Sequence, residues 1–328
     1  MAGSSQPPLV PTDTAVQAGV GGDHRGVARR RRVRRVTRRD QIVLVLMVIV
    51  PIVMTLGLVW LPAVATVLLS FTNWNGIGSL SQIHWIGFKN YHDVATIYPP
   101  FWPAVRHNLL WLAVLFLVAT PLGIFLAVLI DKGLRGSRFY QTSLFLPVVL
   151  SLALVGFIWQ LQYSQDYGFL NFALQKLHLI QEPIDWYGEP GINIWAVLIA
   201  TCWRHVGYIM LLYLAGLKGV DPSLREAAEV DGANEVQTFF RIVFPVMRPI
   251  NVIVFVITVI ESLRAFDIVW VVNKGRNGLE LISALVTQNV IGEASRVGFG
   301  SALATIMLVV SLVFIVIYLA TVLREEEP

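Results

Sequence analysis

The chain has 328 residues, of which 55% are hydrophobic and 14% are charged. Soluble domains carry roughly 25% charged residues, so this balance excludes an ordinary soluble domain and indicates an integral membrane protein. The formal net charge is only +4, and a single cysteine excludes a disulfide framework and a cysteine-built metal site.

The N-terminal region consists of a polar segment followed by a block of arginines. Residues 1–24 are rich in Gly, Pro, Ser, Gln and Thr without apolar periodicity, which predicts disorder. Such a block of arginines can bind nucleic acid, and its arginine pairs are similar to a twin-arginine export signal. The arginines stand directly before a long apolar run, at positions Arg25, Arg29, Arg30, Arg31, Arg32, Arg34, Arg35, Arg38 and Arg39.

The apolar run after the arginines favours a third interpretation. It extends from Ile42 to about Phe71, whereas the core of a signal peptide has about 7–15 residues. We therefore predict a retained membrane span and no nucleic-acid partner. Residues 1–40 are then a disordered, basic segment held in the cytoplasm by the positive-inside rule, close to anionic lipid. Residues 41–328 are predicted to form the membrane domain.

The rest of the chain contains further apolar runs of about 20 residues or more, the length that crosses about 30 Å of hydrocarbon. Together with the first they give six predicted spans, at about 42–70, 105–130, 139–163, 192–217, 247–271 and 299–323. Positive residues lie in the connections after the second, fourth and sixth spans, whereas the loop from Ser164 to Pro190 is mainly acidic. This distribution predicts that both termini and residues 218–249 lie inside the cell.

A polar, helix-prone segment at residues 218–249 separates the fourth span from the fifth. Asp221 can cap a helix whose first position is Pro222, and Asp231-Gly232 can end that helix in a turn. The pattern predicts a helix-turn-helix outside the membrane, and we expect a branched residue at position 232 to obstruct the turn. The second helix carries an apolar surface that must pack against something, formed by Phe239, Phe240, Ile242, Val243 and Phe244.

Ionisable residues occur inside two of the predicted spans, where a charge costs about 2.5–3.5 kcal/mol even on the mildest scale. Arg204 lies midway along the fourth span. Glu261, Arg264 and Asp267 are spaced three apart, on one side of the fifth. Two interpretations remain open. The residues line a polar pathway for a hydroxyl-bearing solute, or they neutralise one another, Arg264 within its own helix and Arg204 across the bundle.

A second polar group ends the third span. Gln160 and Tyr163, with Trp159 and Gln162, combine aromatic rings with amides, which suits stacking on a sugar and hydrogen bonding to its hydroxyls. Tryptophan and tyrosine also collect at membrane interfaces for reasons of their own, so both interpretations stay open. The candidate substrate-pathway residues are Arg204, Glu261, Arg264, Asp267, Gln160 and Tyr163.

The chain lacks the sequence motifs of an enzyme. It contains no Gly-x-x-x-x-Gly-Lys-Ser/Thr phosphate loop, so it is not expected to hydrolyse ATP itself. It also contains no His-Glu-x-x-His zinc pattern and no Gly-x-Ser-x-Gly nucleophile elbow. We therefore expect no catalytic residue, no metal site and no cofactor bound by this chain.

Residues 218–249 resemble the cytoplasmic signature of the membrane subunits of ATP-binding-cassette importers. That signature reads Glu-Ala-Ala, then Gly, then Ile-x-Leu-Pro, and this chain has Phe244 in place of the leucine. Asp231 and Ala233 extend the likeness to the carbohydrate branch, similar to permeases for maltose and glycerol phosphate. The resemblance implies that the segment is the coupling helix that contacts an ATPase subunit. The coupling residues that it implies are Glu226, Ala227, Ala228, Asp231, Gly232, Ala233, Phe239, Ile242 and Pro245.

Segments outside residues 218–249 resemble the same family. They are Trp85–Tyr91 and Tyr167–Asn171, which look like its external Gly-x-x-Asn elements, then Phe266-Asp267 and the small-residue stretch Gly298–Ala304. One stretch departs from the family: Asn273–Gly278 stands where a Thr-x-Gly-Gly-Pro loop is usual. The shape of that loop is therefore not carried over.

The resemblance implies an all-α integral membrane fold with six transmembrane helices, both termini inside, of the type I importer permease kind. It implies a non-catalytic subunit in a bacterial cell membrane that imports a carbohydrate or related polyol. The implied partners are the lipid bilayer, an extracytoplasmic solute-binding protein and ATPase subunits that bind ATP and Mg. One coupling segment per chain also implies a second, homologous permease, because two ATPase domains need two such contacts.

Two alternatives come from other classes of protein. A secondary transporter would be driven by an ion gradient and would need coupling-ion sites at broken helices in matching halves, yet no convincing internal repeat is present. A non-transport membrane scaffold would explain the spans but leave the spacing of the signature a coincidence. Co-purification of a subunit that contains a phosphate loop separates both alternatives from an importer permease.

Overall fold

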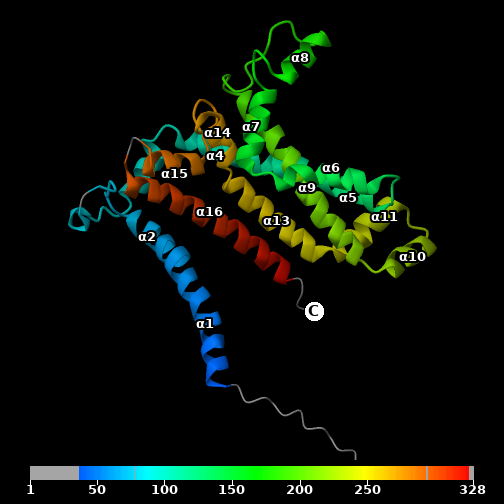
Figure 1. Ribbon diagram of the computed structural model, residues 1–328, viewed down its shortest axis with the longest axis horizontal. Helices are drawn as coiled ribbons and strands as arrows, with labels where there is room; N and C mark the ends of the chain where they lie inside the picture. Colours follow the sequence, from blue (N-terminus) through cyan, green and yellow to red (C-terminus); the bar gives the residue numbers. More distant parts are fainter. Residues whose placement is uncertain (1–36, 78, 293–294, 325–328) are drawn as a thin grey trace, which may run out of the picture. The chain divides into compact units, whose positions relative to one another are not determined.

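The computed structural model describes residues 37–77, 79–292 and 295–324 (Figure 1). Most of the predicted disordered segment, up to residue 36, lies outside this range. The described residues fall into two units that meet between Thr55 and Leu56. Their backbone is helical and forms no β-sheet, apart from one isolated bridge between Thr72 and Trp85. The all-helical class predicted from the sequence is confirmed.

The first unit contains the helix α1, Arg38–Thr55. Its start is fixed locally, because Thr37 Oγ1 accepts a bond from the backbone N–H of Asp40 while Asp40 Oδ2 accepts one from the N–H of Thr37. The last residues of the segment 1–40 are therefore helical rather than disordered. The side chains of α1 are exposed within the described structure, as expected for a helix whose surroundings are lipid.

The second unit contains all the remaining helices. In chain order they are η1 (Leu56–Trp60), α2 (Leu61–Leu69), η2 (Leu80–Gln82), α3 (Lys89–Thr96), α4 (Phe101–Val114), η3 (Leu115–Ala119), α5 (Thr120–Asp131), α6 (Ser137–Val149), α7 (Leu152–Gln162), α8 (Phe169–Lys176), α9 (Asn193–Gly219), α10 (Pro222–Val230), α11 (Glu235–Thr238), η4 (Phe239–Val243), α12 (Phe244–Val246), α13 (Arg248–Leu263), α14 (Asp267–Asn273), α15 (Ile282–Val290) and α16 (Val297–Arg324).

Four helical segments of the described chain are long and apolar enough to cross a membrane. They are Arg38–Leu69, Phe101–Asp131, Asn193–Gly219 and Val297–Ala320, which correspond to the first, second, fourth and sixth predicted spans. Two further helix pairs pass the same test only when each bent pair is taken as one span, which raises the number to six. A multi-pass membrane protein is therefore confirmed.

The third predicted span, 139–163, is not one straight helix. It is broken between α6 and α7, which are bent by 103° against each other (Figure 1). Pro147 weakens the end of α6 because its nitrogen has no hydrogen to donate. Leu150 then turns to an extended conformation, and Ser151 caps α7 by accepting a bond from the N–H of Leu154 at 3.2 Å. Hydropathy alone missed this break because the residues on both sides of it are apolar.

Helix α9 is the centre of the second unit. It packs along α5 on one side and against α6 on another (Figure 1). Glycines make both contacts possible: a Cβ added to Gly123 of α5 would lie 2.7 Å from Ile209 Cβ, and one added to Gly207 would lie 2.1 Å from the carbonyl oxygen of Leu144. Small residues therefore let α9 pack closely against α5 at Gly123 and against α6 at Gly207. The helices α10 to α12, which belong to the predicted segment 218–249, follow directly after the end of α9.

Candidate functional site

The first arm of the candidate site is the helix α10, and it begins as the sequence predicts. The carboxylate of Asp221 accepts a bond from the N–H of Ser223 at 2.9 Å, and Pro222 occupies the first helical position. The bond from the backbone of Ser223 lowers the pKa of the Asp221 carboxyl, so the cap is charged at neutral pH. A charged cap also interacts favourably with the positive end of the helix dipole.

The turn at Gly232 ends α10. Gly232 has a φ of 78°, in the left-handed region, and its N–H donates to the carbonyl of Glu229 at 3.0 Å. The N–H of Ala233 donates to the carbonyl of Ala228 at 2.9 Å. These two bonds form a Schellman motif, which satisfies carbonyl groups that the helix end would leave free. The predicted glycine turn is present.

The second arm starts with a capping box that was not singled out in the sequence. Asn234 accepts from the N–H of Gln237 at 2.9 Å, and the Gln237 side chain accepts from the N–H of Asn234 at 3.0 Å. The pattern Asn-x-x-Gln was a readable signal for this box. The arm continues through α11, η4 and α12, and the helical segment Glu235–Val246 then bends by 78° into Arg248–Asn273.

The apolar side chains of the second arm divide into an inner and an outer set. Val243 is 3% exposed and packs with α5 and α9, and Phe239 and Phe244 pack partly against the same cluster. Phe240, Val236 and Val230, in contrast, are 63%, 65% and 88% exposed. Part of the predicted docking surface is thus used within the chain itself. The part left over consists of large apolar side chains on both arms that the described chain leaves uncovered.

The two arms, α10 and α11 to α12, together form a helical hairpin. The predicted coupling residues differ in how deeply they are buried in this hairpin. Ala228 is buried, and Ala233, Phe239 and Ile242 are partly buried. The remainder are exposed, namely Glu226, Ala227, Asp231, Gly232 and Pro245. The structure therefore offers the carboxylate of Glu226 to a partner, whereas Ala228 serves the packing of α10 on its own chain.

Replacing Gly232 tests whether the turn sets the angle between the arms. Apart from the two neighbouring residues of the chain, no heavy atom lies within 4 Å of a Cβ added there, so the space around the turn is open to a Cβ. The cost of a branched residue there is the left-handed backbone, about 1–2 kcal/mol. We expect Gly232→Val to lower solute import severalfold in reconstituted complexes and Gly232→Asn, which tolerates this conformation, to retain most of it. Equal import by both variants would show that the conformation of the turn does not matter.

Of the candidate pathway residues, the structure brings two together. Arg204 on α9 and Glu261 on α13 form a long ion pair, with Nη1 and Oε2 3.9 Å apart. Arg204 Nε also donates to the carbonyl oxygen of Leu150 at 3.2 Å, which lies at the break between α6 and α7. The pairing of Arg204 across the bundle is therefore present, and the same guanidinium satisfies a carbonyl that the break leaves free.

The prediction that Glu261, Arg264 and Asp267 lie on one side of a single helix is wrong. Helix α13 ends at Leu263 with Arg264 as its cap, and α14 begins at Asp267, so the residues do not continue on one side of one helix. Within residues 248–273, all of which the structure describes, no ion pair joins Arg264 to Glu261 or Asp267. Both Arg264 and Asp267 are exposed. Neutralisation within the helix is thus ruled out in this conformation.

The aromatic group at the end of α7 is a packed cluster. Tyr163 is 4% exposed, and its ring centre lies 5.1 Å from that of Trp159, 5.4 Å from Trp186 and 5.2 Å from Tyr187. Tyr163 therefore has no free ring face for a solute in this conformation. Gln160 is exposed and remains available.

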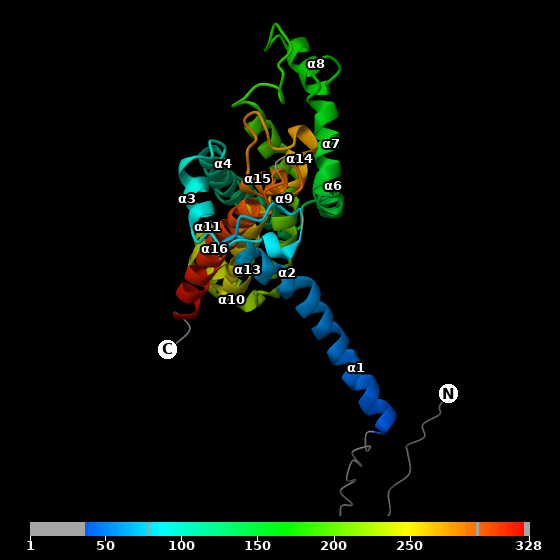
Figure 2. The same ribbon diagram turned by 90° about the vertical axis from the view of Figure 1, so that its left-hand side faces the viewer.

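The two Gly-x-x-Asn elements are explained by their asparagines, which are buried and hold loops together. Asn171, at the start of α8, binds the backbone of Gln165 and Ile184 and accepts from Trp186 Nε1 at 2.9 Å. It thereby closes the long loop that extends beyond α7 (Figures 1 and 2). Asn90 likewise donates to the carbonyls of Ser70 and Thr72, both at 2.8 Å, and ties α3 to the end of α2.

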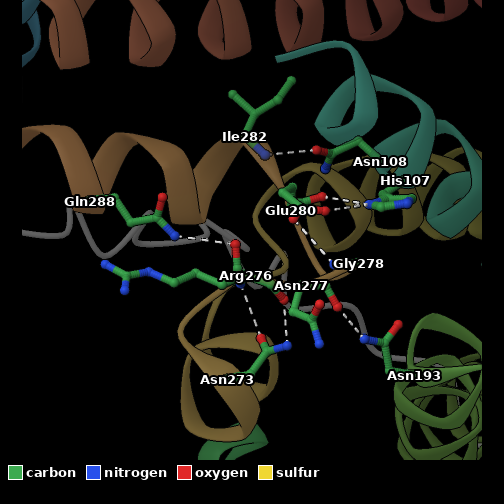
Figure 3. A network of polar contacts seen from close by, with 11 residues as sticks. His107, Asn108, Asn193, Asn273, Arg276, Asn277, Gly278, Glu280, Ile282 and Gln288 are labelled. Carbon is green, nitrogen blue, oxygen red and sulfur yellow. Dashed lines mark hydrogen bonds and ion pairs between the residues drawn. The ribbon is translucent and has the colours of Figure 1, made fainter. Parts of the chain in front are cut away.

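The loop that departs from the family, Asn273–Gly278, is held by polar contacts on both sides (Figure 3). Lys274, Gly275, Asn277 and Gly278 all have positive φ, so the chain is tightly coiled there. Asn193 of α9 donates to the carbonyl of Asn277 at 2.6 Å.

The same network continues to α4, where His107 Nδ1 lies 2.9 Å from the carbonyl of Glu280 and Asn108 accepts from the N–H of Ile282 at 3.0 Å (Figure 3). The loop is therefore fixed to α4 and α9 by this chain's own residues.

Comparison with known proteins adds a family and a fold. Residues 119–325 match the family described as binding-protein-dependent transport system inner membrane component. A probable ABC transporter permease protein of Pyrococcus horikoshii is 31% identical over 86% of this chain and 97% of its own length. A xylose/arabinose import permease protein of Haloferax volcanii is 31% identical over 74% of this chain and 76% of its own.

A solved structure has the same fold. It is a bacterial alginate ABC transporter in complex with an alginate pentasaccharide-bound periplasmic protein, and one of its chains superposes with a TM-score of 0.75. The match covers 88% of this chain and 96% of that chain at 21% sequence identity. At this identity the likeness concerns the fold alone.

Proposed function

Because the chain belongs to the binding-protein-dependent transport system inner membrane components, the permease subunits of ATP-binding-cassette importers, we propose that its hairpin α10–α12 is the contact through which an ATPase subunit drives transport. The chain would form the translocation pathway together with a second permease. ATP and Mg would be bound and ATP hydrolysed in the ATPase subunits, since this chain has no phosphate loop.

The observation that carries this proposal is the outer surface of the hairpin. Glu226 and Ala227 of α10 are exposed beside Val230, Val236 and Phe240, which are large apolar residues in water-facing positions. A patch of apolar side chains next to a carboxylate is suited to a protein partner that supplies an apolar groove and a basic residue. The Schellman turn and the capping box fix this surface before any partner binds, which reduces the ordering cost of docking.

We propose a carbohydrate or a related polyol as the solute and the bacterial cell membrane as the location. Support comes from the relative named for xylose and arabinose and from the alginate transporter with the same fold. An extracytoplasmic solute-binding protein would deliver the solute, since the family is defined by dependence on such proteins. An ion-gradient-driven transporter or a scaffold is not favoured, because neither requires a structured, partly apolar hairpin outside the spans.

Purification of the complex from its native membrane tests the proposal. We expect an ATPase subunit with a phosphate loop to co-purify, and liposomes that hold the complex to accumulate solute only with ATP and solute-binding protein. Accumulation that follows an imposed ion gradient without ATP would contradict the proposal.

The composition of the same complex tests the pairing of permeases. The described part of the chain has one such hairpin, and two ATPase domains need two, so the proposal requires a second permease. We expect a distinct homologue rather than a second copy. Intact-complex mass spectrometry should then find one copy of this chain beside one of another permease. Two copies of this chain, with no second permease, would contradict the heterodimer.

A further inference from the structure

Two ion pairs connect the hairpin to the end of α5. Arg225 Nη1 of α10 lies 2.9 Å from Oδ2 of Asp131, the last residue of α5. Lys132, the next residue along, contacts the carboxylate of Glu235, the first residue of α11, through Nζ and Oε2. Each arm of the hairpin therefore has one ion pair to the same helix end. Neither pair was predictable from sequence, because the partners are 94 and 103 residues apart.

Arg225 makes a second contact, which joins α9 to the same point. Its Nη2 donates to the carbonyl oxygen of Leu217, in the last turn of α9, at 3.3 Å. A cation is favoured at the C-terminal end of a helix, where carbonyl groups lack partners and the dipole is negative. The Asp131 side chain is only 16% exposed, so removal of Arg225 would leave a largely buried carboxylate without its partner. One guanidinium thus links α10, α5 and α9.

The space between these ion pairs is open. A cleft of about 490 Å³ lies between the hairpin and the ends of α5 and α9, lined among others by Val128, Leu217, Glu229 and Thr238. Close packing does not hold the tips of the two arms against α5 here. The buried Val243 anchors only the far end of the second arm. Ala228 buries one side of α10, and within the described residues the polar contacts that connect α10 and the start of α11 to the end of α5 are the two ion pairs.

We propose that Arg225–Asp131 and Lys132–Glu235 are positioning pairs that make the hairpin move as one body with α5 and α9. The inference rests on the proposed function, in which an ATPase subunit displaces the hairpin. Because α5 and α9 pack closely at Gly123, a hairpin held to α5 by the ion pairs transmits its displacement to both helices. A hairpin that is not fastened can follow the ATPase while the spans stay behind, so ATP is hydrolysed without import.

Charge reversal in the complete complex, reconstituted in liposomes, tests the proposal. The variants are Asp131→Arg and Lys132→Glu, with the swapped pairs Asp131→Arg/Arg225→Asp and Lys132→Glu/Glu235→Lys. Solute uptake and ATP hydrolysis are measured on the same liposomes. We expect each single reversal to lower the number of solute molecules imported per ATP by about fivefold, while hydrolysis continues.

The swapped pairs should recover to different extents. Lys132→Glu/Glu235→Lys restores an ion pair and should regain most of the import per ATP. Asp131→Arg/Arg225→Asp should regain less, because an aspartate at position 225 cannot donate to the carbonyl of Leu217. The matched control is Arg135→Glu, an exposed residue of the same connection that has no ion pair within the described part of the chain, and it should behave as wild type.

The outcomes separate this inference from the function on which it rests. If the single reversals keep the wild-type ratio of uptake to hydrolysis, the positioning pairs are refuted while the importer stands. The positioning role is also refuted if uptake, hydrolysis and the amount of assembled complex fall together and the swapped pairs do not recover. That result would mean that the ion pairs only stabilise the complex. If wild-type complex shows no ATP-dependent uptake at all, the proposed function fails and this inference fails with it.

Discussion

Replacing Glu226 by alanine is expected to lower ATP-driven import by about 30-fold or more while the complex still assembles. The side chain is exposed on α10 and takes part in no ion pair within the described residues, so its removal does not disturb the chain itself. At an interface, truncating one partner of a buried charge pair costs about 2–5 kcal/mol, because the other charge is left without a partner. The loss should therefore appear in coupling rather than in folding.

The measurement combines solute uptake with the stimulation of ATP hydrolysis by loaded solute-binding protein. In the alanine variant, hydrolysis should lose its response to solute. The comparison variant is Glu229→Ala, which removes the same group from the same helix but at a position that lines the cleft towards α5, so we expect a smaller loss. Wild-type uptake by the Glu226 variant would show that this surface is not the force-bearing contact.

The hairpin was predictable because its signals are local. An aspartate before a proline, a glycine after the last helical residue and an apolar pattern each act within a few residues, and the structure has α10 and its turn where they place them. The breaks in the spans were harder to predict from sequence. Pro147 was a readable signal for the first break, but apolar residues on both sides concealed it; the end of α13 before Arg264 has no comparable mark.

The features that could not be predicted from sequence depend on contacts between distant parts of the chain. Val243 was expected on a docking surface, yet it is buried against α5 and α9, because an apolar pattern does not say which partner covers it. The ion pair of Arg225 with Asp131 joins positions that no periodicity connects. Tyr163 was a candidate for solute contact because it ends a span, and only the fold of the loop brings Trp186 and Tyr187 onto its ring.

Arg204 and Glu261 are expected to behave differently, although they form one ion pair. Arg204 has a second partner, the carbonyl of Leu150 at the break between α6 and α7, and a hydrogen bond to a charged group contributes about 1.5–3 kcal/mol. Among the described residues Glu261 has only the long contact to Arg204, and its side chain is 39% exposed against 23% for Arg204. We therefore expect Arg204 to stabilise the broken helix and Glu261 to contact the solute.

Three variants of the purified complex separate these roles. Arg204→Met should lower the melting temperature of the complex, because the Leu150 carbonyl loses its donor. Glu261→Gln should leave the melting temperature unchanged and raise the KM for uptake severalfold. The swapped double variant Arg204→Glu/Glu261→Arg should not recover stability, since a carboxylate at position 204 cannot donate to the carbonyl. Recovery by the swap would mean that the ion pair alone supports the bundle, and unchanged uptake kinetics in Glu261→Gln would remove that residue from the pathway.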